Sequence, residues 1–163
     1  MEITIREFEP KDIEAMCEIW NTVVDEANAF PQNNRLDAES AMKFFGGQTF
    51  TGVAENAETR EIVALYILHP NNVGRCSHIC NASYAVKKTA RGAGIGHRIV
   101  AHSLEKGKER GFRIMQFNAV TAANSAAHAL YGKLGFIRLG TVPGGYLLPD
   151  GSYDDITLYY KPL

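Results

Sequence analysis

Apolar and polar residues alternate along some stretches of the chain and recur at helical spacing along others. Strict alternation near the N-terminus is typical of a half-buried strand. From Ile13 to Val24 the apolar residues recur every three or four positions, which predicts a helix with one buried face. We expect Trp20 and Cys17 on that face to be core residues rather than site residues. These patterns predict strands at residues 2–6, 50–55, 62–69, 79–86, 112–120, 136–140 and 153–160, and helices at 10–24, 37–45, 95–111 and 124–135.

The order of these elements predicts the fold class. Strands followed by helices, with hairpins at both ends of the chain, indicate an α/β layer with a mixed sheet. The 163 residues suffice for one domain with a substantial core, and no repeat, low-complexity segment or linker divides them. We therefore expect a single domain over residues 1–163.

Composition and charge argue against several classes of function. The formal net charge of −1 gives no general attraction to nucleic acid or anionic membranes, so any recognition of phosphate must be local. An odd number of cysteines, 3, argues against a disulfide framework and fits a reducing compartment. The N-terminus lacks the pattern of a signal peptide, and no apolar run reaches membrane-spanning length. We expect a cytoplasmic protein without a nucleic-acid or membrane partner.

A glycine-rich loop follows the predicted strand at residues 79–86 and opens into the next helix. Glycine has no Cβ to block the conformations that turn several backbone N–H groups toward one point. Together with the N-terminus of a helix, such groups form an anion site that suits phosphate. Lys87 or Lys88 can add positive charge at its edge, as can the arginine of the loop. The loop residues are Arg91, Gly92, Ala93, Gly94, Ile95 and Gly96.

The spacing of the glycines excludes two common phosphate-binding motifs. A nucleotide P-loop ends in Gly-Lys-Ser/Thr, whereas Gly96 is followed by His97 and Arg98. The dinucleotide fingerprint needs Gly-x-Gly-x-x-Gly and an acidic residue after the next strand, where this chain has Asn118. The sequence therefore does not favour a nucleotide-binding protein.

Two blocks of residues in the second half of the chain resemble one family. The first, Arg91-x-x-Gly94-x-Gly96, resembles the pyrophosphate-binding signature of the GNAT superfamily of acyl-CoA-dependent N-acyltransferases. The second runs from Asn124 to Phe136 and is similar to the family pattern Asn-x-x-Ala-x-x-Leu-Tyr-x-Lys-x-Gly-Phe. The resemblance implies a GNAT-type single domain, with a mixed, largely antiparallel sheet flanked by helices and with splayed central strands.

In this superfamily acyl-CoA lies in the gap between the splayed strands, which here would be residues 79–86 and 112–120. The resemblance implies that acetyl-CoA is the cosubstrate, with its pyrophosphate on the N–H groups of the glycine loop and its pantetheine along Tyr84–Val86. A backbone N–H near Val86 would then polarise the thioester carbonyl. The implied cofactor-binding residues are Tyr84, Val86, Arg91, Gly92, Ala93, Gly94, Ile95, Gly96, Asn124 and Tyr131.

Two residues of the second block are implied to be catalytic. Tyr131 lies where the family has a tyrosine that protonates the leaving thiolate, and a phenol that hydrogen-bonds the departing sulfur helps it to leave. The alternative is that Tyr131 only packs in the core. Asn124 lies where the family has an asparagine that binds pantetheine, although asparagine is also a favoured helix N-cap. One residue could do both.

The sequence does not identify the group that removes the proton from the acceptor amine. Many family members carry a carboxylate on the strands beside the gap, but here those strands have no Asp or Glu. The alternatives are His78, bulk water and Glu26. His78 alternates with Cys76 and Cys80, which suggests a packed face. This spacing offers zinc only three ligands, so we favour core packing and expect no metal.

A closer resemblance narrows the acceptor, to a subfamily that includes the fungal acetyltransferase acting on proline analogues such as azetidine-2-carboxylate. It implies that Asn81 and Asn118 bind substrate beside Asn124, because uncharged amides can hydrogen-bond the carboxylate of a small amino acid. It also implies a lid at 30–32, led by Phe30, that sets specificity. That relative carries tryptophan where this chain has Tyr131, which leaves open whether both mechanisms apply. The similar segments are residues 74–82, 116–120 and 121–124.

The sequence thus predicts an N-acetyltransferase that moves an acetyl group from acetyl-CoA to the amine of a small molecule, such as an amino or imino acid, by direct attack in a ternary complex. Two alternatives remain. The acceptor could be a protein N-terminus or lysine, or the chain could be a non-catalytic acyl-CoA sensor. Homodimers are common in the superfamily, but the sequence does not show which surface would form one.

Overall fold

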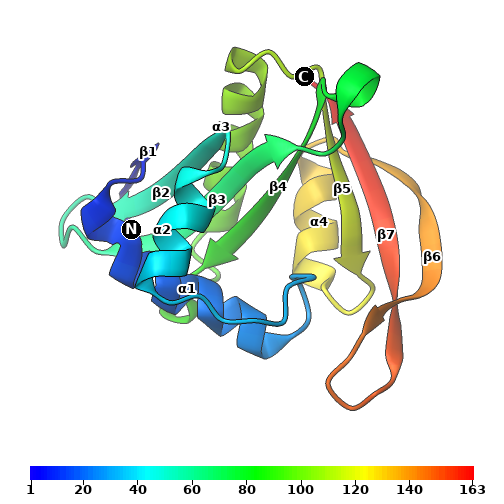
Figure 1. The fold of residues 1–163 in the computed structure, drawn as a ribbon, viewed down its shortest axis with the longest axis horizontal. Helices are drawn as coiled ribbons and strands as arrows, with labels where there is room; N and C mark the ends of the chain where they lie inside the picture. Colours follow the sequence, from blue (N-terminus) through cyan, green and yellow to red (C-terminus); the bar gives the residue numbers. More distant parts are fainter.

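The predicted strands assemble into one mixed sheet. In the computed structural model, which describes residues 1–163, the seven strands are ordered β1-β2-β3-β4-β5-β7-β6 (Figure 1). Only β4 and β5 are parallel, and all other neighbours are antiparallel. The strands are β1 (Ile3–Glu7), β2 (Phe50–Asn56), β3 (Ile62–Pro70), β4 (Ile79–Val86), β5 (Ile114–Thr121), β6 (Ile137–Leu147) and β7 (Tyr153–Pro162).

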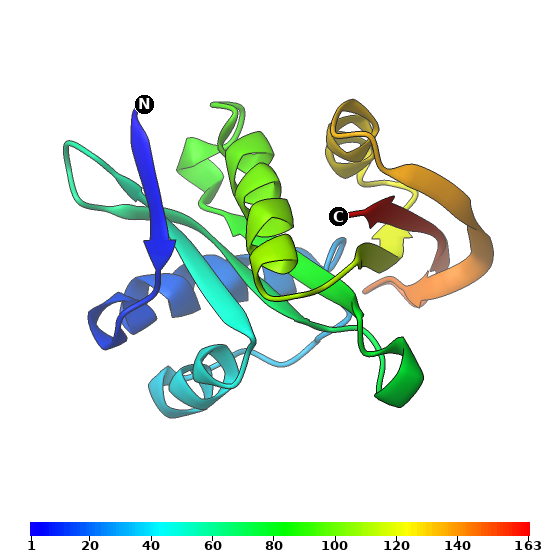
Figure 2. The same cartoon turned by 90° about the horizontal axis from the view of Figure 1, so that it is seen from above.

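Helices cover both faces of the sheet. Helices α1 and α2 lie against one face, and α3 and α4 against the other (Figure 2). None of them combines the length and the apolar character needed to cross a bilayer. The α-helices are α1 (Ile13–Glu26), α2 (Ala38–Gly46), α3 (Ile95–Glu109) and α4 (Ser125–Lys133), and the short 3-10 helices are η1 (Pro10–Asp12), η2 (Gly74–Cys76) and η3 (Lys88–Ala90).

Alternate residues of the central strand β3 build two separate cores. Tyr66 belongs to the core under α3, whereas the adjacent Leu65 belongs to the core under α1 and α2, because successive side chains of a strand point to opposite faces. Trp20 is buried in the second core and packs on Phe30, with ring centroids 4.2 Å apart. The prediction that Trp20 is a core residue is confirmed, while Cys17 is only half-buried at the edge of this core.

The central strands diverge, as the resemblance implied. Strands β4 and β5 pair only through Ile79–Ile114 and Cys80–Met115, although both continue for six residues beyond these pairs. The sheet therefore opens into a gap between the C-terminal halves of β4 and β5 (Figure 1). This single α/β domain has the fold class that the sequence predicts.

One strand is longer than predicted. The expected end of β6 at Gly140 is wrong, because the strand continues to Leu147 through a stretch that contains Pro143, Gly144 and Gly145. Register shifts between Arg138 and Gly140 and between Val142 and Tyr146 accommodate this stretch as bulges. A proline is tolerated there because β6 is an edge strand, where an absent N–H need not break the ladder.

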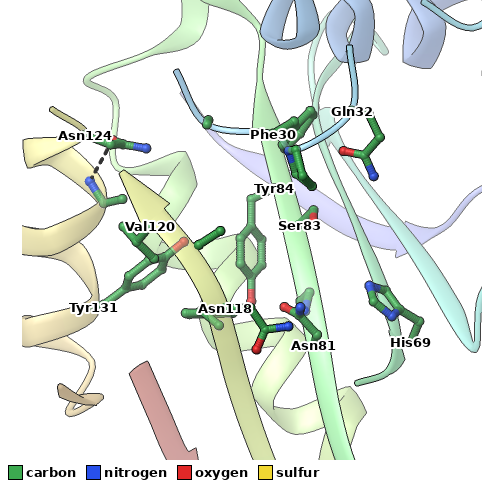
Figure 3. Close-up of a pocket in the computed structure, with 16 residues that line it drawn as sticks. Phe30, Gln32, His69, Asn81, Ser83, Tyr84, Asn118, Val120, Asn124 and Tyr131 are labelled. Carbon is green, nitrogen blue, oxygen red and sulfur yellow. Dashed lines mark hydrogen bonds between the residues drawn. The ribbon is translucent and has the colours of Figure 1, made fainter. Parts of the chain in front are cut away.

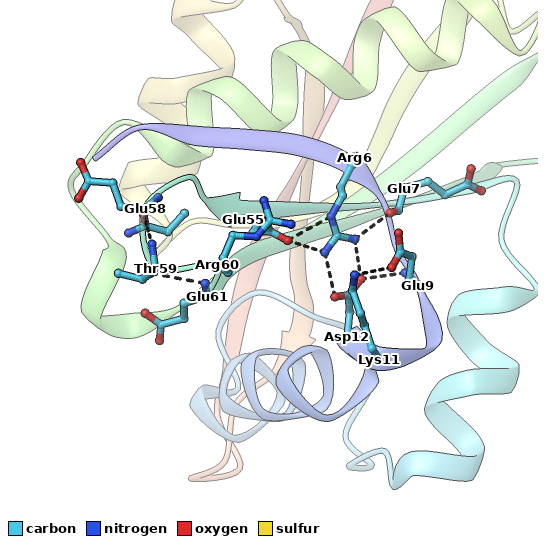
Figure 4. Close-up of polar contacts among 11 residues, drawn as sticks. Arg6, Glu7, Glu9, Lys11, Asp12, Glu55, Glu58, Thr59, Arg60 and Glu61 are labelled. Carbon is cyan, nitrogen blue, oxygen red and sulfur yellow. Dashed lines mark hydrogen bonds and ion pairs between the residues drawn. The ribbon is translucent and has the colours of Figure 1, made fainter.

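A buried ionic cluster fixes the start of α1 to the first two strands (Figure 4). Arg6 on β1 donates to Asp12 at 2.7 Å and to Glu55 on β2 at 2.6 Å, and each of these carboxylate side chains is only 4% exposed. Burial alone would raise the pKa of Asp12, but the hydrogen bonds from Arg6 and from the backbone N–H of Glu9 lower this pKa below its ordinary value. Asp12 therefore stays ionised and paired.

Candidate active site

Two cavities meet where β4 and β5 diverge. The first, which we call the asparagine cavity, has a volume of about 420 Å³ and includes Asn81 and Asn118 in its lining. The second, the glycine-loop cavity, has a volume of about 340 Å³ and is lined in part by the loop before α3. Because the same residues form a wall of both, the cavities are two ends of one cleft. The shared lining residues are Ala29, Tyr84, Asn124, Ala127 and Tyr131.

The glycine loop leaves open space in front of the N-terminus of α3. Gly92 and Gly94 have φ values of 82° and 76°, in the left-handed region that favours glycine. A Cβ built at either position would meet nothing within 4 Å, so the space above the loop is free for a ligand. No side chain caps α3, which leaves its first N–H groups available. Of the six predicted loop residues, only Ala93 does not line the cavity.

Arg91 enters the glycine-loop cavity already paired. Its two terminal nitrogens donate to the carboxylate of Glu26 at 2.9 Å each, and its Nε donates to the carbonyl of Val86 at 3.2 Å. The pair joins the end of α1 to the glycine loop, and both residues line the cavity. Glu26, one of the sequence candidates for the base, is thus held by Arg91 and does not line the asparagine cavity.

The inner edge of β4 carries free backbone donors. Asn71 donates its N–H to Ile79, and Lys87 donates to Val63, so odd-numbered positions along β4 pair with β3. Hydrogen bonding alternates along a strand, so the even-numbered positions face the gap. The N–H groups of Tyr84 and Val86 therefore point into the cleft, where β5 no longer pairs with them.

Tyr131 projects from α4 into the shared wall, where its ring packs on Phe117 with centroids 4.4 Å apart. Burial, with the nearby Tyr159 second, raises the pKa of Tyr131 above its ordinary value, so the phenol is protonated at neutral pH. Its hydroxyl makes no hydrogen bond within the protein. Since no buried side-chain oxygen or nitrogen is without a partner, this hydroxyl must reach the cleft.

Asn124 caps α4. Its Oδ1 accepts from the N–H of Ala127 at 3.2 Å, which leaves the amide NH₂ group for the cleft. The prediction of a helix cap is confirmed. Because Asn124 lines both cavities, the cap does not conflict with a second role at the cofactor.

Asn81 and Asn118 come from opposite sides of the gap (Figure 3), and hydrogen bonds join both to a third asparagine. Asn71, in the turn after β3, accepts from Asn118 at 2.6 Å and from Asn81 at 3.3 Å. Gln116 donates to Asn118 at 3.1 Å, and Asn81 also accepts from the N–H of Ala82. These contacts fix the orientation of both amides. Asn71 could not be found from sequence spacing, because its place follows from the pairing of β3 with β4.

The predicted lid is anchored to the body of the domain. Thr121 at the end of β5 donates to the carbonyl of Asn28 at 2.6 Å, and Tyr146 on β6 donates to the carbonyl of Phe30 at 2.7 Å. Phe30, Pro31 and Gln32 all line the asparagine cavity. The segment thus forms a fixed wall over this cavity.

Comparison with known proteins assigns the chain to a family. The model described as "Acetyltransferase (GNAT) family" matches residues 13–136, which include the glycine loop and the whole of α4. The chain belongs to the GNAT acetyltransferase family.

The chain is similar in sequence to two acetyltransferases. The chain is 33% identical over 99 residues to the N-acetyltransferase aca1 of Schizosaccharomyces pombe, a match that covers 60% of this chain and 47% of the relative. The matched segment thus spans about half of the yeast protein. The chain is 26% identical to YwnH of Bacillus subtilis, whose name assigns it provisionally as a phosphinothricin acetyltransferase, over 93% of this chain and 94% of the relative.

Solved GNAT structures share the fold. A GCN5-related N-acetyltransferase from Kribbella flavida superposes with a TM-score of 0.90 at 28% identity, covering 99% of this chain and 98% of that chain. A phosphinothricin acetyltransferase from Sinorhizobium meliloti in complex with AcCoA has a TM-score of 0.89 at 22% identity, covering 100% and 89%.

The prediction that Cys76, His78 and Cys80 form a packed face is wrong. Cys76 ends the 3-10 helix η2 rather than lying on the strand, and both Cys76 and His78 are exposed. Only Cys80 is buried, where burial raises the pKa of its thiol to about 12. His78 lines neither cavity, so the structure places this candidate base outside the cleft. No three His, Cys, Asp or Glu side chains lie close enough to hold a metal ion.

One ionisable residue of the cleft is not predicted from the sequence. His69, near the end of β3, lines the asparagine cavity. His69 follows an apolar run that is typical of an ordinary buried strand, and it belongs to no recognisable motif. Its position in the cavity depends on the pairing of β3 with β4 and cannot be predicted from local sequence.

Proposed function

We propose that this GNAT domain transfers the acetyl group of acetyl-CoA to the amine of a small molecule by direct attack in a ternary complex. The observation that carries the proposal is the shared wall of the two cavities, which includes Tyr84, Asn124 and Tyr131. A donor in the glycine-loop cavity and an acceptor in the asparagine cavity would meet at this wall. Such an arrangement favours direct transfer, because it brings both reactants to one point.

The residues of the glycine-loop cavity fit acetyl-CoA, which supplies the acetyl group as a thioester. The left-handed Gly92 and Gly94 and the uncapped N-terminus of α3 leave several N–H groups free for a pyrophosphate. Arg91 supplies positive charge at the edge, once its pairing with Glu26 is exchanged for pairing with phosphate. The edge of β4 from Tyr84 to Val86 is not paired with β5, which supports the prediction that pantetheine lies along it.

Three groups of the chain can act at the thioester. The free N–H groups of Tyr84 and Val86 face the gap, so either can donate to the thioester carbonyl as charge develops on its oxygen. The unpaired hydroxyl of Tyr131 can donate a proton to the departing sulfur. Asn124 can use its free amide NH₂ group to orient the pantetheine arm while it caps α4.

The asparagine cavity supports a small acceptor. Its lining contains no Asp or Glu, and Phe30 and Pro31 form part of its wall instead of an open acidic groove that would suit a peptide. The fixed amides of Asn81 and Asn118 can hydrogen-bond a polar group of an amino or imino acid without a cation. The name of the Bacillus relative, which refers to phosphinothricin, adds support for a small-molecule acceptor.

A CoA-release assay with acetyl-CoA tests this function. The acceptor panel contains simple amines, amino acids, imino acids such as azetidine-2-carboxylate, and short peptides with free N-termini. We expect release of CoA with one class of small amine. Turnover with the peptides alone would move the assignment to a protein acceptor, and calorimetric binding of acetyl-CoA without any turnover would favour a sensor.

A further inference from the structure

One lining residue of the asparagine cavity carries a side chain that can accept a proton. We propose that His69 is the general base that removes the proton from the acceptor amine. This proposal rests on the proposed function and supplies the base that the strands beside the gap lack.

The other lining residues cannot serve as the base. None of the 16 is Asp, Glu, Lys, Arg or Cys, so the titratable side chains among them are His69, Tyr84 and Tyr131. Burial raises the pKa of both tyrosines above the ordinary value, which keeps them protonated, so they can donate a proton but not accept one. An imidazole, by contrast, has a lone pair available at neutral pH.

A backbone contact selects the tautomer of His69 that a base requires. Its Nδ1 lies 2.9 Å from the carbonyl oxygen of Pro70. A carbonyl oxygen only accepts hydrogen bonds, so Nδ1 must carry the proton and donate it. In the neutral ring the lone pair then belongs to Nε2, which is the nitrogen left free to accept a proton.

The position of His69 places this nitrogen beside the predicted acceptor site. His69 on β3 lies directly opposite Asn81 on β4, and cross-strand partners point to the same face of a sheet. Figure 3 shows the ring beside Asn81 and below Gln32, on the wall opposite Tyr131. No charged side chain from β3, β4, β5, α4 or the lid lines this cavity to compete for the proton.

The proton transfer balances without any further reactant. One N–H bond of the acceptor ammonium breaks, its electron pair stays on the nitrogen as the attacking lone pair, and an Nε2–H bond forms on His69. The imidazolium then releases this proton to solvent through the open side of the cavity. The nitrogen lone pair forms the new C–N bond, the C–S bond breaks, and the sulfur takes a proton from Tyr131. The nitrogen, now bonded to the acetyl carbon, loses its second proton to the Tyr131 phenolate, which restores the phenol.

The proposal is tested by comparing His69→Gln with His78→Gln, a matched change at an exposed histidine outside both cavities. With a strongly basic amine as acceptor, we expect His69→Gln to lower kcat about 10²-fold at pH 7 and to leave the KM for acetyl-CoA unchanged. The loss should shrink as the pH approaches the pKa of the acceptor, because more of the amine is then neutral without a base. His78→Gln should retain the wild-type kcat.

Several outcomes would overturn this assignment. If the His69→Gln enzyme turns over as fast as the wild type, His69 is not the base, while the proposed function still holds. The same conclusion follows if the substitution changes only the KM for the acceptor. A loss that is the same at every pH would indicate a packing defect. A wild-type enzyme that releases no CoA with any acceptor would contradict the proposed function itself. Nitrogen NMR of the His69 ring, which needs no turnover, should show a protonated Nδ1; the opposite tautomer would contradict the proposal.

Discussion

Of the two tyrosines that line both cavities, only Tyr131 keeps a free hydroxyl. The hydroxyl of Tyr84 is held 2.7 Å from the Oγ of Ser103 on α3, within the core under that helix. Tyr131 instead rests its ring on Phe117 and Phe136 and leaves its oxygen without a partner in the protein. The packing and the proposed acid chemistry of Tyr131 thus use different parts of one side chain.

This division of labour makes Tyr131→Phe an informative change. The substitution removes the oxygen and keeps the ring, so the free energy of unfolding should stay close to that of the wild type. If the hydroxyl protonates the leaving sulfur, kcat should fall about 10²-fold with little change in the KM for acetyl-CoA. Tyr159→Phe is the control, because Tyr159 bonds His128 at 2.5 Å and lines neither cavity. Equal kcat values for both variants would make Tyr131 a packing residue.

At the scale of elements, the loop between β4 and α3 contains the left-handed glycine conformation on which the proposed acetyl-CoA site depends. Gly94 is both the N-cap of α3 and a lining residue of the glycine-loop cavity. Gly111, just after the end of the same helix, has a similar φ of 87° and also has nothing within 4 Å of a built Cβ. The two glycines therefore differ in their surroundings but not in the strain that a side chain would cause.

This pair allows backbone strain to be separated from ligand binding. We expect Gly94→Ala and Gly111→Ala each to lower the free energy of unfolding by about 1–2 kcal/mol, because an alanine at positive φ is strained. Only Gly94→Ala should also weaken acetyl-CoA binding, as measured by calorimetry on the folded proteins. Equal affinities for the two variants would argue against phosphate binding at this loop.

The sequence predicts those helices and strands whose positions depend on local periodicity. It does not predict the features that depend on contacts between distant residues. The apolar faces of α1 and α3 and the glycine loop are local features, so their positions follow from spacing. The extension of β6 beyond Gly140 depends on pairing with β7, which overrides the local signal of its glycines. The exposed position of Cys76 and the cavity position of His69 likewise depend on how the β3–β4 turn folds. Spacing alone therefore brings the glycine-loop residues to one cavity, whereas it does not place His69 or Cys76.

The cluster of Arg6, Asp12 and Glu55 is another feature without a local signal, since it joins positions 49 residues apart. We expect Asp12→Asn to lower the free energy of unfolding at pH 7 by about 2–3 kcal/mol, because it leaves Arg6 with a missing partner in a buried setting. The pKa of Asp12 is depressed by folding, so its contribution is present above the unfolded value and is lost as the pH falls through the folded one.

The difference between wild type and Asp12→Asn should thus narrow as the pH drops below 3.8, the ordinary pKa of this carboxyl. Chemical denaturation at several pH values measures it. Lys11→Gln is the neighbouring control, because the Lys11–Glu9 pair is exposed and screened by solvent, so its loss should leave the free energy of unfolding nearly unchanged. A constant difference across this pH range would show that Asp12 acts through packing rather than through its charge.

At the scale of the whole molecule, one end of the sheet is a candidate surface for a homodimer. Strand β6 is an edge strand, and ten of its eleven residues are exposed. An edge strand has a row of backbone groups free to pair with another strand, and clustered apolar side chains mark interfaces. Most of the exposed large apolar residues of the molecule gather here: Ile137, Leu139, Val142 and Leu147 on β6, with Tyr153 on β7.

We predict that two copies pair through β6 about a two-fold axis, because an antiparallel edge can meet its own copy in this way. Leu139→Lys, which adds a charge to the middle of this surface, should then convert a dimer to a monomer in sedimentation velocity experiments. Val73→Lys is the matched control, since Val73 is 86% exposed but lies in the turn after β3. Neither residue lines the cleft, so both variants should bind acetyl-CoA like the wild type. A wild-type protein that sediments as a monomer at all concentrations would contradict this assignment, and the exposed side chains of β6 would then require a different partner.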